Sequence, residues 1–217
     1  MLSRPLQTVE FGPPGSLQYR MIFVDPSVGE EVSPLNGVQL YQGTTQLNFI
    51  CKTPRGYWAE FEAAHDEPCN PLRLRERHRG PSHFAQNARW HLGMLPQTWA
   101  DGDQVNDQYG GIPYDNRPID VIDIGGRAAR TGDVYPVKPL AAFAVIEEGK
   151  YLCWKIIAID AADLMAASLA DVTDVDRTMP DVLQEIRDWL RTCHCVTPGQ
   201  HGRHLLPRGP PPSPPSP

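Results

Sequence analysis

Short segments with a strand-like pattern, separated by proline and glycine turns, constrain the fold of this chain most. Residues 19–24 are rich in β-branched and aromatic side chains and stop at Asp25-Pro26. Residues 46–53 and 57–63 flank Pro54-Arg55-Gly56, which predicts a hairpin. Many short strands joined by such turns are typical of a closed or nearly closed small barrel. The other predicted strands are 38–41, 120–124, 134–140, 142–146 and 155–159.

A helical pattern appears only late in the chain. Thr178 is a predicted helix N-cap, with Pro180 in the first turn and Asp181 three residues on. The apolar residues that follow recur at helical spacing, so we expect them to pack on the core without a direct role in function. These residues are Val182, Leu183, Ile186, Trp189 and Leu190.

Length and composition indicate one globular domain and exclude several classes of protein. The chain has 217 residues, 41% of them hydrophobic, which is enough for a real core. Its net charge of −6 disfavours a nucleic-acid partner, whose binding surface is normally basic. No apolar run is long enough to span a bilayer, and residues 1–5 do not resemble a secretory signal. We therefore expect a cytoplasmic protein with neither nucleic-acid nor membrane partners.

The cysteines are odd in number and irregularly spaced, which favours free thiols in a reducing compartment. A zinc site built from Cys193-His194-Cys195 with His201 and His204 is the alternative, but its spacing fits no common zinc module. The five cysteines are Cys51, Cys69, Cys153, Cys193 and Cys195.

The last part of the chain has a different composition from the rest. Residues 207–217 are mostly proline and cannot bury a core, so they are expected to form a solvated, polyproline-like tail. A ligand for a proline-binding partner is the alternative reading. We accordingly divide the chain into a folded domain at 1–196 and a tail at 197–217.

An acidic segment carries the clearest chemical signal: Tyr114-Asp115-Asn116-Arg117-Pro118-Ile119-Asp120-Val121. Magnesium prefers oxygen ligands, and carboxylates on a loop and the strand after it can supply them. Pro118 restricts the backbone between the two aspartates, Asp115 and Asp120. Acidic turns are common, so the spacing alone is a weak signal for metal binding.

The segments around this motif make the signal specific. The 114–121 motif resembles the Asp-Asn-Asp-Pro-Ile-Asp-Val signature of soluble (family I) inorganic pyrophosphatases of the eukaryotic type. The similarity extends from about Gln18 to Cys195. Further matching segments lie at 48–55, 69–72, 92–99, 131–140, 147–149 and 154–160.

The resemblance implies a fold, an activity and a set of site residues. The implied fold is α+β but mainly β: a five-stranded, OB-like closed barrel with helices packed outside. The implied activity is Mg²⁺-dependent hydrolysis of pyrophosphate to two phosphates, with Asp115, Asp120 and Glu147 as metal ligands. Glu62 matches a site glutamate, and Lys155 matches a lysine that holds phosphate. The family normally continues past the late helix, so we expect that part to be missing or replaced here.

Several positions depart from the family pattern. Arg117 stands where the family has an aspartate that binds metal and accepts a proton from the attacking water. Arginine has only donors and stays protonated, so it can do neither. The protein is therefore either a Mg²⁺-dependent inorganic diphosphatase or a degenerate relative that works by binding, as a homodimer or paired with an active relative. Other departures are Lys52, Glu60, His83, Leu92, Cys153, Cys193 and His194.

Two of these departures suggest local charge compensation. Lys52 and Glu60 reverse the charges of the family, and a cross-strand pair over the predicted hairpin would retain their attraction. Arg117 is expected either to neutralise Asp115 and Asp120 as a metal would, or to point into solvent.

Overall fold

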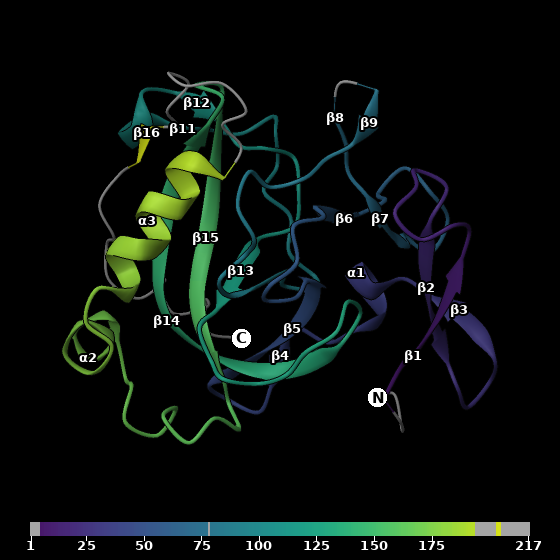
Figure 1. The fold of residues 1–217 in the computed structure, drawn as a ribbon, viewed down its shortest axis with the longest axis horizontal. Helices are drawn as coiled ribbons and strands as arrows, with labels where there is room; N and C mark the ends of the chain where they lie inside the picture. Colours follow the sequence, from purple (N-terminus) through teal and green to yellow (C-terminus); the bar gives the residue numbers. More distant parts are fainter. Residues whose placement is uncertain (1–4, 78, 194–202, 205–217) are drawn as a thin grey trace.

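The structure is a computed structural model that describes residues 5–77, 79–193 and 203–204. Within these residues the fold is mainly β with few helices (Figure 1). One sheet has the order β1-β2-β7-β6, with β3 also paired to β2. Its strands are β1 (Gln7–Phe11), β2 (Arg20–Asp25), β3 (Glu30–Val32), β6 (Phe61–Ala63) and β7 (Leu72–Leu74).

A second sheet has the order β16-β14-β15-β13-β10-β5-β4. Because β14 pairs with both β15 and β5, the strands β14, β15, β13, β10 and β5 form a closed ring of hydrogen-bonded neighbours. The mainly β fold is thus confirmed, whereas the OB-like barrel type stays a prediction. The strands are β4 (Tyr41–Gln42), β5 (Gln46–Thr53), β10 (His91–Met94), β13 (Asp120–Asp123), β14 (Val134–Glu147), β15 (Tyr151–Asp160) and β16 (Arg203–His204).

The remaining elements are short. Two small ribbons pair β8 with β9 and β11 with β12. Ser33 caps α1 by accepting a hydrogen bond from the backbone N–H of Leu35. The bounds are β8 (Glu76–Arg77), β9 (Gly80–Pro81), β11 (Val105–Asn106), β12 (Ile112–Pro113), α1 (Pro34–Gly37) and a 3₁₀ turn, η1 (Asp107–Tyr109).

The long β14–β15 hairpin separates two layers of the core. Alternate residues of a strand face opposite sides, and Ile157 and Ile159 pack in the cluster that includes the late helix. Ile156 and Ala158 pack instead with Phe49 in a separate cluster. The two segments predicted at 134–140 and 142–146 are one strand with an irregularity between Pro139 and Ala141.

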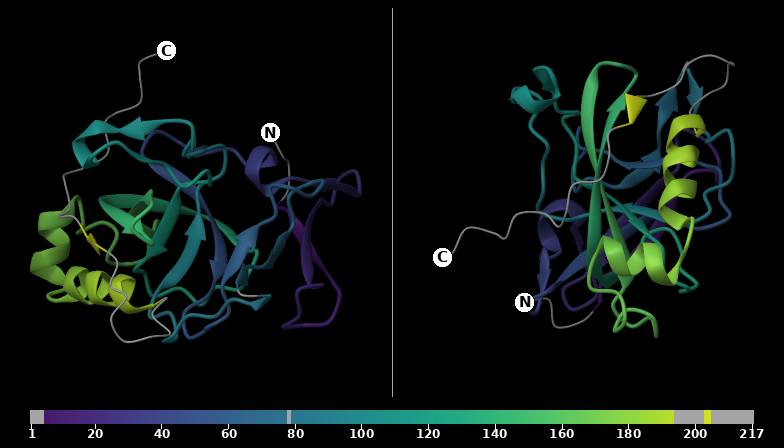
Figure 2. Two further views of the ribbon diagram at one scale, coloured as in Figure 1. Left: turned by 90° about the horizontal axis from the view of Figure 1, so that it is seen from above. Right: turned by 90° about the vertical axis from the view of Figure 1, so that its left-hand side faces the viewer.

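The helices α2 (Val172–Thr178) and α3 (Val182–Thr192) lie together on one flank of the molecule, opposite β1–β3 (Figures 1 and 2). The predicted apolar stripe is confirmed as core: Ile186 and Trp189 are buried, and Leu190 packs at the edge of the same cluster. The predicted N-cap is wrong, because Thr178 ends α2 and α3 begins after Asp181, whose φ is 73°. The helix α2 was not predicted from the sequence; its N-cap Asp171 accepts hydrogen bonds from two backbone N–H groups.

The predicted hairpin across residues 54–56 is also wrong. β5 belongs to the ring, while β6 pairs with β7 in the other sheet. The segment between them bonds elsewhere: Glu60 N–H donates to the carbonyl of Ser82, and Arg75 N–H donates to the carbonyl of Glu60. Proximity in sequence therefore did not decide which strands pair.

The cysteines that the structure describes are Cys51, Cys69, Cys153 and Cys193, and all are free. Cys195, together with His194 and His201 of the alternative zinc site, lies outside the described residues. Of the predicted tail at 197–217, the structure describes Arg203 and His204, which pair with β14. In the part of the chain that is described, no helix has the length and apolar character needed to cross a membrane.

Candidate functional site

A cluster of two lysines and two carboxylates lies where β5, β13, β14 and β15 converge. Asp120 begins β13 and is directly opposite Lys155 on the parallel strand β15. The Lys155 ammonium donates to Asp120 Oδ2 at 2.6 Å and to Glu147 Oε1 at 2.9 Å. Lys52, on β5, donates to the other Asp120 oxygen, Oδ1, at 2.7 Å. Both oxygens of one carboxylate are thus held by ammonium groups; we call these four residues the lysine–carboxylate cluster.

Burial makes the charges of this cluster mutually dependent. Only 9% of the Lys155 side chain is exposed. Burial alone would lower the pKa of Lys155, but Asp120 and Glu147 hold it well above its usual range. Burial alone would raise the pKa of Asp120, yet the ammonium groups of Lys155 and Lys52 hold it well below its usual range. The ion pairs therefore outweigh desolvation for both groups.

Asp115 lies beside the cluster and outside its hydrogen bonds. Tyr114 forms an isolated parallel bridge with Leu152, which brings the acidic segment alongside β15. Burial raises the pKa of the Asp115 carboxyl, and the negative charge of Asp120 raises it further. Burial likewise raises the pKa of the nearby Cys153 thiol. The predicted metal aspartates are thus close together, but Asp115 sits where its charged form is disfavoured.

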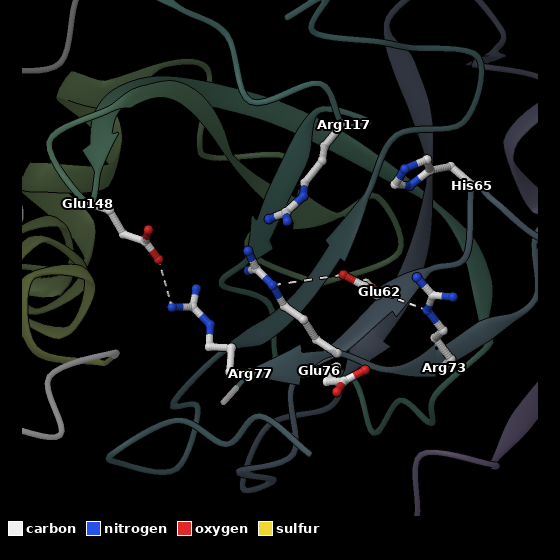
Figure 3. Close-up of a pocket in the computed structure, with 8 residues that line it drawn as sticks. Glu62, His65, Arg73, Glu76, Arg77, Arg117 and Glu148 are labelled. Atoms are coloured by element: carbon white, nitrogen blue, oxygen red, sulfur yellow. Dashed lines mark hydrogen bonds and ion pairs between the residues drawn. The ribbon is translucent and has the colours of Figure 1, made fainter. Parts of the chain in front are cut away.

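A second feature is a pocket of about 450 Å³ that is lined mostly by charged side chains (Figure 3). Three of its arginines alternate along residues 73–77, so they share one face of an extended segment. Glu148 follows Glu147 directly in sequence, so this arginine pocket borders the lysine–carboxylate cluster. Its lining residues are Glu62, His65, Arg73, Arg75, Glu76, Arg77, Arg117 and Glu148.

Carboxylates neutralise most of the arginines in the pocket. Glu62 is directly opposite Arg73 in the β6–β7 pair and accepts from its Nε at 3.0 Å. Arg73 also bonds to Asp66 and Glu67, which lie outside the pocket lining. Another glutamate of the lining, Glu148, forms an ion pair with Arg77 at 3.0 Å.

Arg117 differs from the other arginines of the pocket. Its side chain points into the pocket (Figure 3), and among the described residues no carboxylate lies within ion-pair distance of its guanidinium. The hypothesis that Arg117 neutralises Asp115 and Asp120 through ion pairs is therefore wrong. The alternative that it points into solvent stays a prediction, since the half-buried side chain faces an open pocket. Lys52 and Lys155 neutralise Asp120 instead: Lys155 lies on the neighbouring strand β15, and Lys52 reaches Asp120 from β5, one strand beyond β10.

The predicted Lys52–Glu60 pair is also wrong. Lys52 bonds to Asp120, whereas Glu60 accepts from Arg75 and from the Ser82 hydroxyl, each at 2.6 Å. The physical reason is the absence of the hairpin, which was to bring the two side chains together.

Comparison with known proteins agrees with these observations. A family model described as inorganic pyrophosphatase matches residues 49–203. The chloroplastic soluble inorganic pyrophosphatase 6 of Arabidopsis thaliana is 41% identical over 182 residues, which are 84% of this chain and 60% of the relative. Human inorganic pyrophosphatase is 34% identical over 190 residues, which are 85% of this chain and 64% of the relative.

The chain belongs to the inorganic pyrophosphatase family. Its fold matches the structure of inorganic pyrophosphatase from Schistosoma japonicum with a TM-score of 0.86 and 32% identity, over 91% of this chain and 71% of the other. An N-terminally truncated vacuolar soluble pyrophosphatase from Trypanosoma cruzi, solved in complex with PPi, also gives 0.86, with 31% identity and coverage of 94% and 84%. The chain spans only 60% and 64% of the length of the two sequence relatives named above.

The side chains present do not fit the multi-metal centre that the family resemblance implies. Within residues 5–77, 79–193 and 203–204, no group of three or more His, Cys, Asp or Glu side chains is arranged to hold a metal ion. Asp120 and Glu147 face the Lys155 ammonium, and Asp120 faces Lys52 as well. Both oxygens of Asp120 and one oxygen of Glu147 thus accept from an ammonium group at 2.6 to 2.9 Å.

The structure thus separates the site residues predicted by family resemblance into two groups. Asp120, Glu147 and Lys155 come together, with Asp115 beside them, whereas Glu62 and Arg117 line the arginine pocket. The pocket residues Arg73, Arg75, Arg77 and His65 were not predicted from the sequence. The alternation of arginine with leucine and glutamate over residues 72–77 was the available signal, since alternate strand residues share a face.

Proposed function

We propose that this chain is a pyrophosphatase-family protein that works by binding and has lost metal-dependent hydrolysis of pyrophosphate. The observation that carries the proposal is the pair of ammonium groups, from Lys52 and Lys155, on the two oxygens of Asp120. A divalent cation would have to displace at least one of them to use this carboxylate.

Electrostatics supports this reading. Magnesium is bound through hard oxygen ligands, commonly one or two carboxylates together with waters. In the lysine–carboxylate cluster, the charges of Lys52 and Lys155 balance those of Asp120 and Glu147. Arg117 then adds a positive charge at a position where the family resemblance implies an aspartate. Fewer oxygen ligands and more fixed cations both oppose the binding of several metal ions.

The alternative function is Mg²⁺-dependent inorganic diphosphatase. The convergence of Asp120, Glu147 and Lys155, with Asp115 beside them, favours it. On this reading Lys52 swings away when metal binds. When bound, the metal ions would supply charge neutralisation and an activated water.

Phosphate release from pyrophosphate, with and without Mg²⁺, tests the proposal. We expect the unaltered chain to give phosphate at the rate of a no-protein blank. Its melting temperature should not rise on addition of millimolar Mg²⁺, since only a ligand that prefers the folded state stabilises it. Turnover by the unaltered chain that requires Mg²⁺ would overturn the proposal in favour of the diphosphatase.

Restoring the acidic character of the site sharpens the test. In the double variant Lys52→Glu, Arg117→Asp, we expect Mg²⁺ to raise the melting temperature, because two fixed cations become oxygen ligands. The matched control is Lys150→Glu, Arg177→Asp, which makes the same charge change at two exposed residues. An equal response to Mg²⁺ in both double variants would show that net charge alone, and not the site, determines the effect.

The proposal also concerns the partner of the chain, its location and its division into two parts. We infer that the chain pairs with a second copy or with an active relative, because a protein that works by binding needs a partner. Light scattering of the purified chain, alone and mixed with an active pyrophosphatase, measures this directly. The cytoplasmic location and the division of the chain at residues 196 and 197 also stay predictions.

A further inference from the structure

Three exposed rings lie at neighbouring positions outside the lining of the arginine pocket. Tyr57 and Trp58 are consecutive in sequence and are 56% and 58% exposed. The Trp58 ring stacks on the exposed ring of His83, with the two centroids 4.5 Å apart and an angle of 33° between the planes. Single exposed apolar side chains are normal, whereas clustered ones indicate an interaction surface. We call Tyr57, Trp58 and His83 the aromatic surface.

The same chain contains a segment with the matching chemistry. Residues 205–217, here called the proline-rich segment, contain seven prolines and neither acidic nor aromatic residues. Such a composition favours the polyproline II conformation, whose backbone carbonyls make no internal hydrogen bonds. Segments of this kind bind to surfaces lined by aromatic rings, because little conformational entropy is lost when they are ordered.

The described parts of the chain that lead to the proline-rich segment lie on the side of the aromatic surface. The Cys193 carbonyl, at the end of α3, accepts from the backbone N–H of Ala85 at 2.7 Å. Ala85 is only two residues after His83. β16, which directly precedes the proline-rich segment, lies beside α3 (Figure 1).

A second set of contacts gives the same placement. β16 pairs with β14 shortly before the turn that holds Glu148. Glu148 forms an ion pair with Arg77 at 3.0 Å, and Arg77 in turn lies 3.7 Å from Glu60, two residues after Trp58. In polyproline II conformation the proline-rich segment would extend about 40 Å. A compact domain of this size is roughly 40 Å across, so the segment is long enough to reach the aromatic surface.

We propose that the aromatic surface binds the proline-rich segment of the same chain in an intramolecular contact. Trp58 and His83 offer ring faces to the proline rings, and the Tyr57 hydroxyl can donate to a free carbonyl of the segment. The covalent connection supplies an effective concentration on the order of millimolar, so a contact too weak to hold a separate peptide stays mostly closed. The inference goes beyond the proposed function and does not depend on whether the chain hydrolyses pyrophosphate.

Limited proteolysis of the full chain with trypsin tests the inference. The proline-rich segment has one basic residue, Arg208, and trypsin cuts the bond between Arg208 and Gly209. Mass spectrometry measures the release of residues 209–217. A synthetic peptide of residues 203–217 gives the rate for the unbound segment. Cleavage follows the population of the open form, so we expect the full chain to be cut about fivefold or more slowly than the peptide.

Substitutions on both sides locate the contact. Trp58→Ala and His83→Ala should each raise the rate towards that of the peptide, whereas Trp58→Phe keeps a ring and should retain most of the protection. Tyr41→Ala is the matched control, since Tyr41 is 50% exposed on β4, and it should leave the rate unchanged. The double variant Pro214→Ala, Pro215→Ala should act as Trp58→Ala does, and combining it with Trp58→Ala should add nothing further.

Three outcomes would overturn the inference. Equal rates for the unaltered chain and the peptide would mean that the proline-rich segment is open and that the aromatic surface serves another partner. Equal rates for the unaltered chain, Trp58→Ala and His83→Ala would mean that the segment is protected elsewhere. Protection that falls on dilution would assign the surface to the proline-rich segment of a second copy. Protection that is independent of concentration and lost in both alanine variants supports the intramolecular contact.

Discussion

Asp120 and Lys155 lie directly opposite each other on the parallel strands β13 and β15, and their side chains form an ion pair of 2.6 Å. The register of the sheet sets this pair, so it does not depend on the conformation of a loop. The Lys52 ammonium donates to the other carboxylate oxygen of Asp120, Oδ1, at 2.7 Å. Asp120 is partly buried, and the Lys155 ammonium that it contacts is buried, so removing either partner leaves an uncompensated charge and destabilises the fold.

Replacing Lys155 is therefore expected to destabilise the fold strongly. Lys155→Met leaves Asp120 and Glu147 without the ammonium that both contact, and we expect a loss of roughly 3 kcal/mol in the free energy of unfolding. Urea unfolding at pH 7 measures it. The control Lys150→Met, at an exposed position, should change the free energy by less than about 0.5 kcal/mol. Equal losses in the two variants would contradict the central role of Lys155.

The pH dependence of stability follows from the depressed pKa of Asp120. An unfolded aspartate titrates near pH 3.9, so the contribution of Asp120 is complete above about pH 5 and is lost as the pH falls through the lower folded pKa. We expect the difference in unfolding free energy between the unaltered chain and Asp120→Asn to be largest near neutral pH and to shrink below about pH 4. Urea titrations at several pH values measure this difference.

The control repeats these urea titrations with and without Asp120→Asn in a chain that also carries Lys52→Met. Asp120 then keeps Lys155 but loses its second ammonium partner. The difference caused by Asp120→Asn near neutral pH should therefore be smaller in that background than in the unaltered chain. A difference that is independent of pH in both backgrounds would rule out the assigned cause.

A fully buried carboxylate, that of Asp123, accepts a hydrogen bond from a tyrosine. The Tyr135 hydroxyl donates to Asp123 Oδ2 at 2.8 Å, and both residues are buried. Tyr135→Phe removes that donor, so we expect a loss of about 1–3 kcal/mol in unfolding free energy. Tyr151→Phe is the matched control, because this tyrosine is 44% exposed. A loss no larger than that of the control would mean that the Asp123 carboxyl does not depend on Tyr135.

Packing of α3 against the ring is tested by truncating its central residue. Ile186 is fully buried in the cluster that contains Ile157 and Phe143. Ile186→Ala should therefore lower the free energy of unfolding by about 2–5 kcal/mol. Leu164→Ala removes a side chain that is 97% exposed and should change it by less than about 0.5 kcal/mol. Chemical denaturation of both variants, compared with the unaltered chain, measures the difference.

Local patterns in the sequence predicted the elements that depend on local physics. The strand at residues 46–53 and the apolar stripe of α3 were both predicted, because side-chain periodicity reflects which face is buried. The start of α3 was not, since Asp181 begins it from a left-handed conformation. The resemblance to pyrophosphatases, later confirmed, rested on ordered motifs that can be read without knowing any contact.

By itself, the sequence determined the family, the mainly β character and the identity of the charged residues. Only the tertiary structure decided their partners: Lys52 reaches Asp120 and not Glu60, and Arg117 enters a pocket with Arg77. The reason is physical. A strand pattern says which side chains share a face, but the pairing of an ion depends on which distant strands become neighbours. Which strands become neighbours depends on the packing of the whole ring of strands.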